Sequence, residues 1–550
     1  MDIVLVGLPG SGKSVVGKRL ANRHAAAFID LDERIERADG RPIPTIFAED
    51  GEAAFRGLER DAVADLGPAD PDPLVRRVIA TGGGAVVDPR NRWALYRGRV
   101  GVWLDGRPEV LAQRLRRSPH VRPLVTGRDP IGTLRDLAAR RERFYAATDI
   151  HVAGVADVST VVTAVEDHLE RRGSGPDAGT RLLSASTPIG RIVIGDRIAA
   201  SAVDAALGRL EARRAIVVSE PGAWEAVGAR IVAELEARGR PVETVLLPEG
   251  EAAKRLSVIE TAASELAQHH ISRGEPLVAI GGGALGDAAG FLAATFLRGI
   301  PIIHVPTSLV AQIDSSIGGK TAVDLPEGKN LVGAFHQPSD VVIDVSLLAS
   351  VPERHRRAAL GEAVKMAALG DERLFELLEQ RGEAIASGDP ASDARGDVAE
   401  LVERCAWAKV EVVVADERER AGTSGRITLN LGHSLGHAVE AAAGFEALLH
   451  GEAVAYGLRA ACRIGGALDV TPPERAARIT SLLDSLGLAT EPLPYPLDEV
   501  LRHLALDKKH DGGRLRWVLP TADGVEVRSD VPDEIVVDAA GSLLAAGSAR

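Results

Sequence analysis

A glycine-rich loop near the start of the chain restricts its fold more than any other feature. Residues 7–14, GLPGSGKS, match the pattern GxxxxGK[ST] at every fixed position. The apolar run IVLV precedes this loop and the helical pattern VVGKRLANR follows it. In a strand–loop–helix setting, the backbone N–H groups and the helix N-terminus bind phosphate oxygens. We therefore expect a phosphate-binding α/β domain, in which Lys13 reaches the outer phosphates and Ser14 holds Mg²⁺.

Length and composition narrow the class of protein. The 550 residues predict about three to five domains. A net charge of −13 argues against a general nucleic-acid binder, which needs a basic face. No apolar run reaches the length of a membrane span, and no signal peptide is recognisable. With only two cysteines, a disulfide framework and a cysteine-based zinc site are excluded, so we expect a cytoplasmic protein with no membrane or nucleic-acid partner.

The pattern of apolar runs divides the chain into four parts. Residues 1–172 alternate short apolar runs with helical stretches, which indicates a parallel sheet. The Gly-, Ser- and Pro-containing stretch from residue 173 predicts a linker over 173–186. A second α/β domain is expected over 187–345, and a mainly helical domain over 346–550.

Two aspartates follow the second apolar run of the first domain. In FIDLD, Asp30 and Asp32 are two residues apart, so on a strand they would share one face. One could serve the Mg²⁺ shell and the other a substrate hydroxyl. An exposed acidic strand end would give the same pattern. The domain lacks the NKxD motif of GTPases and has the size of a small-molecule kinase.

Three further motifs complete a set: FRxxE at Phe55–Glu59, the glycines 82–84 and VRPL at 121–124. Together with the loop and the aspartates, they make residues 1–170 resemble shikimate kinase. The resemblance implies a P-loop kinase fold and shikimate as substrate, with catalytic roles for Lys13, Asp32 and Arg122. It implies shikimate contacts at Asp32, Arg56, Gly83 and Arg141, with Arg122 on a mobile lid. ATP and Mg²⁺ would bind at Gly10, Ser11, Gly12, Lys13, Ser14, Val15 and Arg122, with Asp30 as a further metal residue.

The second half carries a nucleotide loop and a candidate metal site. Residues 281–287, GGGALGD, follow an apolar run and precede a helical one, as expected where backbone approaches a pyrophosphate. His433 and His437 are four residues apart, which places them on one helix face, and His450 follows. Two histidines and a carboxylate such as Glu362 suit a catalytic zinc site. Histidines of a helix surface or a core would also fit this spacing.

Lysines are scarce and most of them fall in the motifs of the second half. The 65 basic residues include nine lysines: Lys13, Lys18, Lys254, Lys320, Lys329, Lys365, Lys409, Lys508 and Lys509. Surface charge tolerates arginine in place of lysine, but a site that needs a compact ammonium does not. A cluster of lysine ammonium groups beside the predicted metal site and nucleotide loop suggests a substrate that carries phosphate and carboxylate.

In this order, GGGALGD, DSSIGGKTAVD, GEAVK, the paired histidines and LHGEAVA resemble 3-dehydroquinate synthase, from about residue 187 to the end. The resemblance implies a Rossmann-like NAD domain, a helical metal- and substrate-binding domain, and a homodimer through Arg298, which reaches the neighbouring site. Zinc or cobalt would bind Glu362, His433 and His450. NAD would contact Glu251, Lys254, Gly282, Gly283, Asp287, Thr307, Ser308, Lys329 and Ser350. Substrate would contact Asp314, Lys320, Asn330, Lys365, Lys409, Arg426, Asn430, His437 and one of Lys508 and Lys509. Of these residues, Asp314, Lys320, Lys365 and His437 would have catalytic roles.

The resemblance implies that a heptulosonate phosphate is oxidised, loses phosphate and is reduced again, so that NAD is regenerated. One departure is Ser219-Glu220, where the family commonly has Thr-Asp at the adenosine ribose. A metal-dependent polyol dehydrogenase and another sugar-phosphate cyclase are the alternatives for this half. The pair Lys409 and Arg426, suited to a carboxylate, favours the synthase. A regulatory module on an inactive enzyme is disfavoured by the intact Lys13, Asp32, Arg56 and Arg122.

Overall fold

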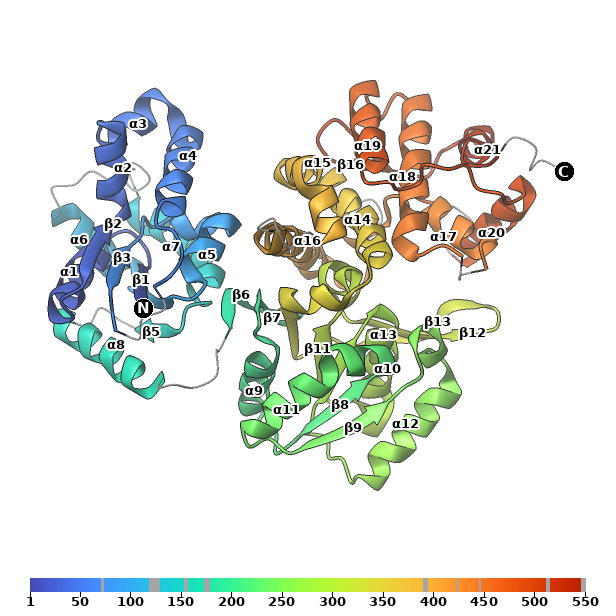
Figure 1. Cartoon of the computed structure of the whole chain (residues 1–550). Helices are drawn as coiled ribbons and strands as arrows, with labels where there is room; N and C mark the ends of the chain where they lie inside the picture. The colour runs from blue at the N-terminus through green and yellow to red at the C-terminus, as the bar shows by residue number, and fades with distance from the viewer. Residues whose placement is uncertain are drawn as a thin grey trace. The chain divides into compact units, whose positions relative to one another are not determined.

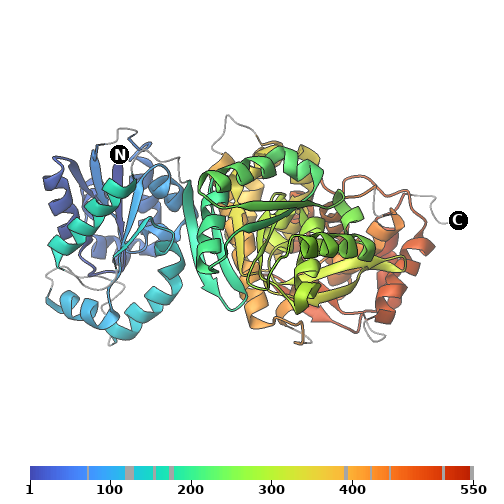
Figure 2. The ribbon, with the colours of Figure 1, turned by 90° about the horizontal axis from the view of Figure 1, so that it is seen from below.

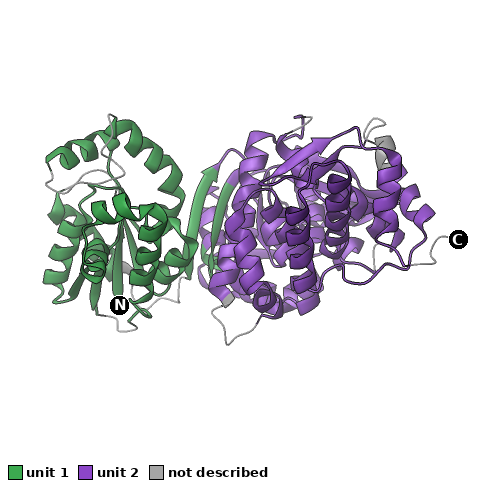
Figure 3. Cartoon of the chain, turned by 90° about the horizontal axis from the view of Figure 1, so that it is seen from above, with its two compact units in different colours: residues 1–186, 191–201 green, residues 187–190, 202–550 purple. Residues whose placement is uncertain are grey.

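The computed structural model describes residues 1–70, 74–117, 129–152, 157–172, 179–388, 394–421, 424–444, 447–510 and 515–545. The chain forms two units (Figure 3). Unit 1 comprises residues 1–186 and 191–201, and unit 2 comprises residues 187–190 and 202–550. Each candidate site lies within one unit, so the units are described separately.

The core of unit 1 is a five-stranded parallel sheet in the order β2-β3-β1-β4-β5. Every residue of the central strand is buried, because helices cover a parallel sheet on both faces. The turned view shows helices on either side of these strands (Figure 2). The strands are β1 (Asp2–Val6), β2 (Ala27–Asp30), β3 (Arg77–Ala80), β4 (Val100–Leu104) and β5 (Ile150–Val152).

The helices of unit 1 follow the strands in the expected alternation. On one face, apolar side chains of the first and last helices pack on β1, β3 and β4 as one core. The helices are α1 (Lys13–Arg23), α2 (Leu31–Asp39), α3 (Ile43–Glu49), α4 (Gly51–Ala64), α5 (Pro89–Tyr96), α6 (Pro108–Arg117), α7 (Pro130–Tyr145) and α8 (Val158–Arg172).

The predicted linker is shorter than expected. Residues 180–186 belong to strand β6 (Thr180–Thr187), which is followed by β7 (Gly190–Asp196) and α9 (Ala199–Arg209). The Gly- and Pro-rich composition ends at Gly179, and the sequence RLLSAS buries four consecutive residues from Leu182 to Ala185. Residues 180–186 of the predicted linker therefore form a strand.

Unit 2 begins with strands that form a second parallel sheet, in which β14-β11-β10-β8-β9 are neighbours. Two of these strands, β8 and β9, lie side by side in Figure 1. A large apolar core lies between these strands and helices α12 and α13. The strands are β8 (Ala215–Ser219), β9 (Val242–Leu246), β10 (Leu277–Gly281), β11 (Ile302–Pro306) and β14 (Asp340–Asp344). The helices are α10 (Pro221–Ala223), α11 (Ala229–Ala237), α12 (Leu256–Gln268) and α13 (Gly283–Thr295). An antiparallel pair, β12 (Lys320–Leu325) and β13 (Gly328–Phe335), precedes β14.

The rest of unit 2 is mainly helical, as the sequence predicts. Its helices are α14 (Glu353–Ala368), α15 (Glu372–Ser387), α16 (Ala394–Ala415), α17 (His433–Ala442), α18 (His450–Ala467), α19 (Pro473–Ser485), α20 (Leu497–His510) and α21 (Asp533–Gly541). One hairpin, β15 (Trp517–Pro520) with β16 (Val525–Arg528), interrupts them. Over the described residues, no helix is both long and apolar enough to cross a membrane. The predicted α/β fold class is confirmed.

A buried ion-pair group stabilises the edge of unit 1 where β1 begins. The Asp2 side chain is fully buried, and its carboxylate contacts Arg77 at 2.6 Å and the buried Arg99 at 3.1 Å. Asp2→Asn would leave Arg99 buried without a full counter-charge, so we expect a loss of about 3–5 kcal/mol in the free energy of unfolding of unit 1. Faster hydrogen exchange of the β1 and β3 amides in the intact chain would report this loss.

Asp65→Asn is the matched control for Asp2→Asn. Asp65 is exposed and its contact with Arg34 is 3.5 Å long. A surface pair of this kind contributes about 0–1 kcal/mol, so exchange should stay close to that of the parent. Equal exchange rates in the two variants would contradict the stabilising role of Asp2.

Candidate active sites

The loop before α1 has a conformation that requires glycine. Gly7, Gly10 and Gly12 have φ angles of 144°, 84° and 94°. A Cβ on Gly7 would lie 2.5 Å from the carbonyl oxygen of Leu104. The Lys13 ammonium donates to the carbonyl oxygens of Gly7 at 2.8 Å and Leu8 at 3.2 Å. The loop, the lysine and the N-terminus of α1 thus have the strand–loop–helix arrangement that the sequence predicts.

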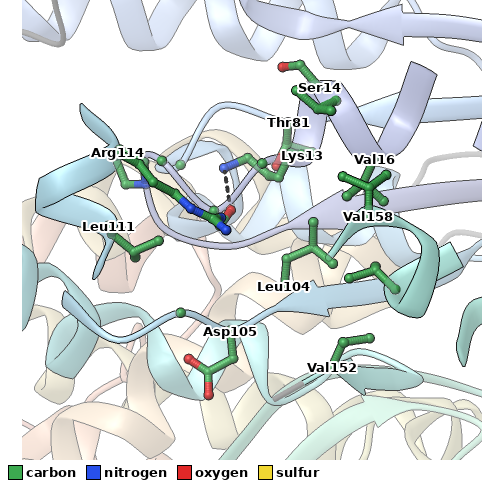
Figure 4. A pocket seen from close by; sticks show the side chains of 18 of the residues that line it. Lys13, Ser14, Val16, Thr81, Leu104, Asp105, Leu111, Arg114, Val152 and Val158 are labelled. Atoms are coloured by element: carbon green, nitrogen blue, oxygen red, sulfur yellow. Dashed lines mark hydrogen bonds between the residues drawn. The ribbon is translucent and has the colours of Figure 1, made fainter. Parts of the chain in front are cut away.

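This loop borders a cavity of about 440 Å³ in unit 1 (Figure 4). Its phosphate end is lined by the loop, Asp30, Asp32 and Gly83. The rest of the lining was not found from the sequence, because α6, β4, β5 and α8 each contribute only one to three residues. These are Leu104, Asp105, Gly106, Leu111, Arg114, Leu115, Val152, Asp157, Val158 and Val161. An apolar wall with one guanidinium suits a flat, polar-edged ring such as a nucleotide base.

Asp30 and Asp32 both line the cavity, but not as two residues of one strand. Asp30 ends β2 and caps α2, and its carboxylate accepts from the backbone N–H of Asp32 at 3.1 Å. Asp32 lies in the first turn of α2, so the predicted shared strand face is wrong. The Ser14 hydroxyl donates to Asp30 at 2.6 Å. Burial, reinforced by Asp32, raises the pKa of Asp30 although the Ser14 hydrogen bond opposes it.

The predicted shikimate residues lie near one another at glycines 82–84. Arg56 contacts the buried Glu59 at 2.7 Å, and a Cβ on Gly84 would lie 2.6 Å from its guanidinium. Arg141 is buried and donates to the carbonyl oxygen of Gly83 at 2.8 Å, as the Tyr145 hydroxyl does at 2.6 Å. Arg122 lies outside the described residues.

In unit 2, three imidazoles converge at the start of α17 and α18. Nitrogen atoms of His433, His437 and His450 lie within 4.8 Å of one another. Glu362, fully buried on α14, places Oε1 at 3.4 Å from Nε2 of His433 and 3.1 Å from Nε2 of His450. The predicted helical spacing of His433 and His437 is confirmed.

The charged neighbours of His437 and His450 differ, and so do the pKa values of these two rings. Burial, with the neighbouring imidazoles, lowers the pKa of His437 to about 3, so this ring is neutral. Burial alone would also lower the pKa of His450, but the hydrogen bonds to Glu362 and Glu440 raise it to about 10. The Glu362 carboxylate thus faces the Nε2 atoms of His433 and His450, and these three side chains are the predicted metal residues.

A line of alternating charges extends from Glu362. Lys365, also buried, contacts Glu362 at 2.5 Å and Asp314 at 3.9 Å. Lys409 contacts the Asp314 carboxylate at 2.7 Å and also donates to its backbone carbonyl at 2.7 Å. Burial opposes the charge of Asp314, but Lys409 and Lys365 hold its pKa below the usual value. Both lysines thus lie in one group with the metal residues.

Other predicted substrate residues meet at a carboxylate that the sequence analysis missed. Glu419 accepts from Lys320 at 2.6 Å and from the amide of Asn430 at 3.1 Å. Arg426 is buried and donates to the carbonyl oxygens of Gly318 and Glu417. Glu419 lies in the loop after α16, where no periodic pattern marks it.

The predicted nucleotide loop lies where β10 meets α13. Gly282 precedes α13. The Glu220 carboxylate accepts hydrogen bonds from the backbone N–H of Gly282 at 3.2 Å and from that of Gly250 at 2.8 Å. The Lys254 ammonium contacts Asp287 at 2.9 Å and donates to Asn330. Glu220, the residue that departs from the family pattern, is therefore placed at the glycine loop.

The remaining predicted residues are positioned as follows. Gly283 begins α13, Thr307 donates its N–H to the carbonyl of Gly281 at 2.9 Å, and Ser308 follows it. Ser350 is exposed, and its hydroxyl bonds the carbonyl of Leu347. Arg298 is exposed, with a φ of 68°. Lys508 and Lys509 fall in α20, and their side chains lie outside the described part.

Glu440 is the second carboxylate that the sequence analysis missed. Its position three residues after His437 places it on the same face of α17, which is the signal that could have identified it. Burial alone would raise its pKa, but hydrogen bonds from His450 and Lys329 lower it to about 2.

Family models match most of the chain. The shikimate kinase model matches residues 9–170, and the N-terminal and C-terminal models of 3-dehydroquinate synthase match residues 244–358 and 359–510. The chain is 45% identical over 330 residues to the 3-dehydroquinate synthase of Symbiobacterium thermophilum, covering 59% of this chain and 89% of that protein.

Two solved structures of synthases are similar to this chain. One is ValA, a 2-epi-5-epi-valiolone synthase from Streptomyces hygroscopicus with NAD⁺ and Zn²⁺ bound, at 28% identity and a TM-score of 0.58. The match covers 64% of this chain and 96% of that one. A 2-deoxy-scyllo-inosose synthase with carbaglucose-6-phosphate, NAD⁺ and Co²⁺ bound matches at 26% identity, 64% and 97% coverage and a TM-score of 0.58. The chain therefore belongs to the 3-dehydroquinate synthase family and carries, ahead of that region, a domain of the shikimate kinase family.

Proposed function

We propose that the two units catalyse two separate reactions of aromatic biosynthesis. Unit 1 transfers the terminal phosphoryl group of ATP to shikimate, and unit 2 converts 3-deoxy-arabino-heptulosonate 7-phosphate to 3-dehydroquinate and phosphate. The observation that carries the second assignment is the line Glu362–Lys365–Asp314–Lys409, which joins the metal residues to buried cations. The reactions are not consecutive, so direct transfer of product between the sites is not part of the proposal.

In unit 1, the chain's own residues suffice to bind and orient both reactants. The glycine loop, Lys13 and the N-terminus of α1 bind the phosphates, and Ser14 and Asp30, which contact each other, would hold Mg²⁺. Asp32 accepts from the attacking hydroxyl and orients it. Arg56 and Arg141, fixed by Glu59 and Gly83, hold the substrate carboxylate and hydroxyls. Arg122 is assigned to the transferring phosphoryl group from its motif.

The donors around Glu362 fit a zinc ion. Both Glu362 oxygens are buried, and two imidazole nitrogens and one ammonium face them. A carboxylate and two imidazoles, with room for a further ligand, is a catalytic zinc set, and Co²⁺ accepts the same donors. When bound, the ion would act as a Lewis acid on a substrate oxygen. Glu362, His433 and His450 would hold it, and His437, a neutral ring, can donate or accept a hydrogen bond beside it.

The cations beyond Lys365 fit a substrate with two anionic groups. Arg426 offers a planar fork for a carboxylate and Lys409 a point charge beside it. Lys320, Asn330 and Asn430 supply further donors, and Asp314 balances the charge of Lys365 and Lys409. NAD would lie along the glycine loop before α13, with Glu220 accepting from its ribose and Lys254, Asp287 and Lys329 around the nicotinamide side. Glu251, Thr307, Ser308 and Ser350 belong to the same NAD assignment, and one of Lys508 and Lys509 belongs with the substrate donors.

The proposal includes a cytoplasmic homodimer formed by unit 2. Arg298 supports the homodimer, because its side chain is exposed next to the apolar Leu297, which is itself 39% exposed. Both residues have left-handed backbone, with φ angles of 68° at Arg298 and 50° at Leu297. Sedimentation of the intact chain at micromolar concentration should give twice the mass of 57.8 kDa.

The assay that tests the proposal supplies the heptulosonate phosphate, zinc and a trace of NAD⁺. We expect one phosphate released per substrate consumed and no lasting NADH absorbance, because the hydride is returned. Lasting NADH without phosphate would identify a polyol dehydrogenase instead. Turnover of a substrate that lacks the carboxylate, at an equal rate, would identify another cyclase. Shikimate-dependent ADP formation by the same preparation tests unit 1.

A further inference from the structure

Glu440 is a buried carboxylate with no role in the reaction proposed above. It lies on α17, one turn after His437, and is 7% exposed. One oxygen lies 3.0 Å from Nδ1 of His450 and the other 3.1 Å from the Lys329 ammonium. A single carboxylate thus joins a residue of the metal group to a residue of the nucleotide group.

The contact with His450 fixes the orientation of its ring. The opposite nitrogen, Nε2, lies 3.1 Å from Glu362, so one edge of the imidazole faces the metal donors and the other faces Glu440. A carboxylate that accepts from Nδ1–H selects the tautomer whose Nε2 lone pair is free for a cation. It also makes that nitrogen a stronger donor.

The contact with Lys329 continues toward the nucleotide loop. Lys329 lies on β13 and also contacts Glu251 at 3.3 Å. Glu251 lies 3.9 Å from Lys254, whose ammonium contacts Asp287 on α13 at 2.9 Å. These charged side chains form a continuous line from His450 to the helix that follows the glycine loop. Any shift of Lys329 when a nucleotide binds therefore changes the charge that faces Glu440.

We propose that Glu440 is a positioning residue that aligns His450 for the metal and, through Lys329, couples metal binding to nucleotide binding. The inference rests on the proposed function of unit 2. Coupling of this kind is reciprocal, so NAD and zinc should each raise the affinity for the other by the same factor.

The test compares the intact chain with its Glu440→Gln variant. Gln keeps the shape but loses the charge that faces His450 and Lys329. Competition with a chromophoric chelator should give a zinc Kd raised about 10–100-fold. In the parent, zinc should tighten NAD binding by at least about 5-fold, and in Glu440→Gln this factor should fall toward one. We call the factor by which zinc tightens NAD binding the NAD–zinc factor. A merely structural role of Glu440 would leave this factor unchanged.

Glu400→Gln is the matched control. Glu400 is 1% exposed on α16 and contacts Arg373 at 3.2 Å and Arg404 at 3.1 Å, away from the histidines. Its substitution should leave both the zinc Kd and the NAD–zinc factor at parental values. If Glu440→Gln fails to fold, Glu440→Asp keeps the charge on a shorter side chain and should show a smaller loss of both quantities.

The outcomes separate this inference from the proposed function. A parent chain that binds neither zinc nor NAD would refute the function of unit 2 and this inference with it. A parent that binds both, beside a folded Glu440→Gln variant with the same zinc Kd and the same NAD–zinc factor, would overturn the inference alone. Shikimate kinase activity of each preparation shows that unit 1 of the same chain is intact.

Discussion

Glu362→Gln is expected to lower the rate of phosphate release from the heptulosonate phosphate by about 10³-fold, since a Lewis acid contributes about 4 kcal/mol to such a step. Glu362 is fully buried, and its carboxylate faces two imidazoles and Lys365. Glutamine has nearly the same shape but no charge, so it binds a metal ion weakly. Zinc content after dialysis should fall in parallel with the rate.

The same substitution has a second expected effect, on stability. Lys365 is 1% exposed, and without Glu362 its nearest carboxylate is Asp314 at 3.9 Å. Loss of one partner of a buried pair lowers the free energy of unfolding by about 3–5 kcal/mol. Thermal unfolding of unit 2 should therefore shift downward while shikimate kinase activity in unit 1 is retained.

Glu379→Gln is the control for this prediction. Glu379 contacts Arg478 at 2.7 Å on the exposed side of α15, and its substitution should leave zinc content and rate unchanged. If Glu362→Gln kept its zinc and released phosphate within about threefold of the parent rate, which is under 1 kcal/mol, Glu362 would not be a metal ligand.

Local patterns were sufficient to predict the parts of each site that lie within one segment. The glycine loop and Lys13 fall in eight consecutive residues, and His433 and His437 are one helical turn apart. Such spacings determine which side chains share a face before any tertiary structure is known. The order of the elements around them then followed from the alternation of apolar runs and helical stretches.

The position of Asp32 shows where a local pattern was misread. The sequence analysis places Asp30 and Asp32 on one strand end, but Asp30 caps α2 and Glu33 stands three residues after Asp30. An Asp followed three residues later by Glu is a helix-start signal that competes with the strand reading. Both carboxylates still line the cavity, on a helix start and not on the predicted strand.

Contacts between distant segments could not be predicted from spacing. Arg114, Val152 and Val158 come from α6, β5 and α8, and only the packing of unit 1 brings them to one cavity. Glu440 contacts Lys329, which is 111 positions earlier in the chain. The spacing of Glu440 from His437 predicts its helix face but not its contact with a distant strand.

Lys13→Met is expected to lower the rate of shikimate-dependent ADP formation by about 10³-fold, as removal of one fixed cation from a charged transition state does. The Lys13 ammonium is held at the loop by the carbonyls of Gly7 and Leu8, so it is already placed beside the phosphate position. Methionine fills the same volume but provides no charge. Because the effect is on the transition state, kcat should fall more than the affinity for ATP.

Lys18→Met is the control that separates the effect of the position of the Lys13 ammonium from the effect of losing one positive charge. Lys18 lies on the same helix, but its side chain is 57% exposed and it contacts Glu33 at 3.5 Å. Both variants lose one positive charge from α1, so a general effect of net charge would appear in both. Phosphate release by unit 2 should be unchanged in each. A Lys13→Met variant that kept more than about a tenth of the parental rate, a difference under 1.4 kcal/mol, would show that the loop backbone alone stabilises the transferring group.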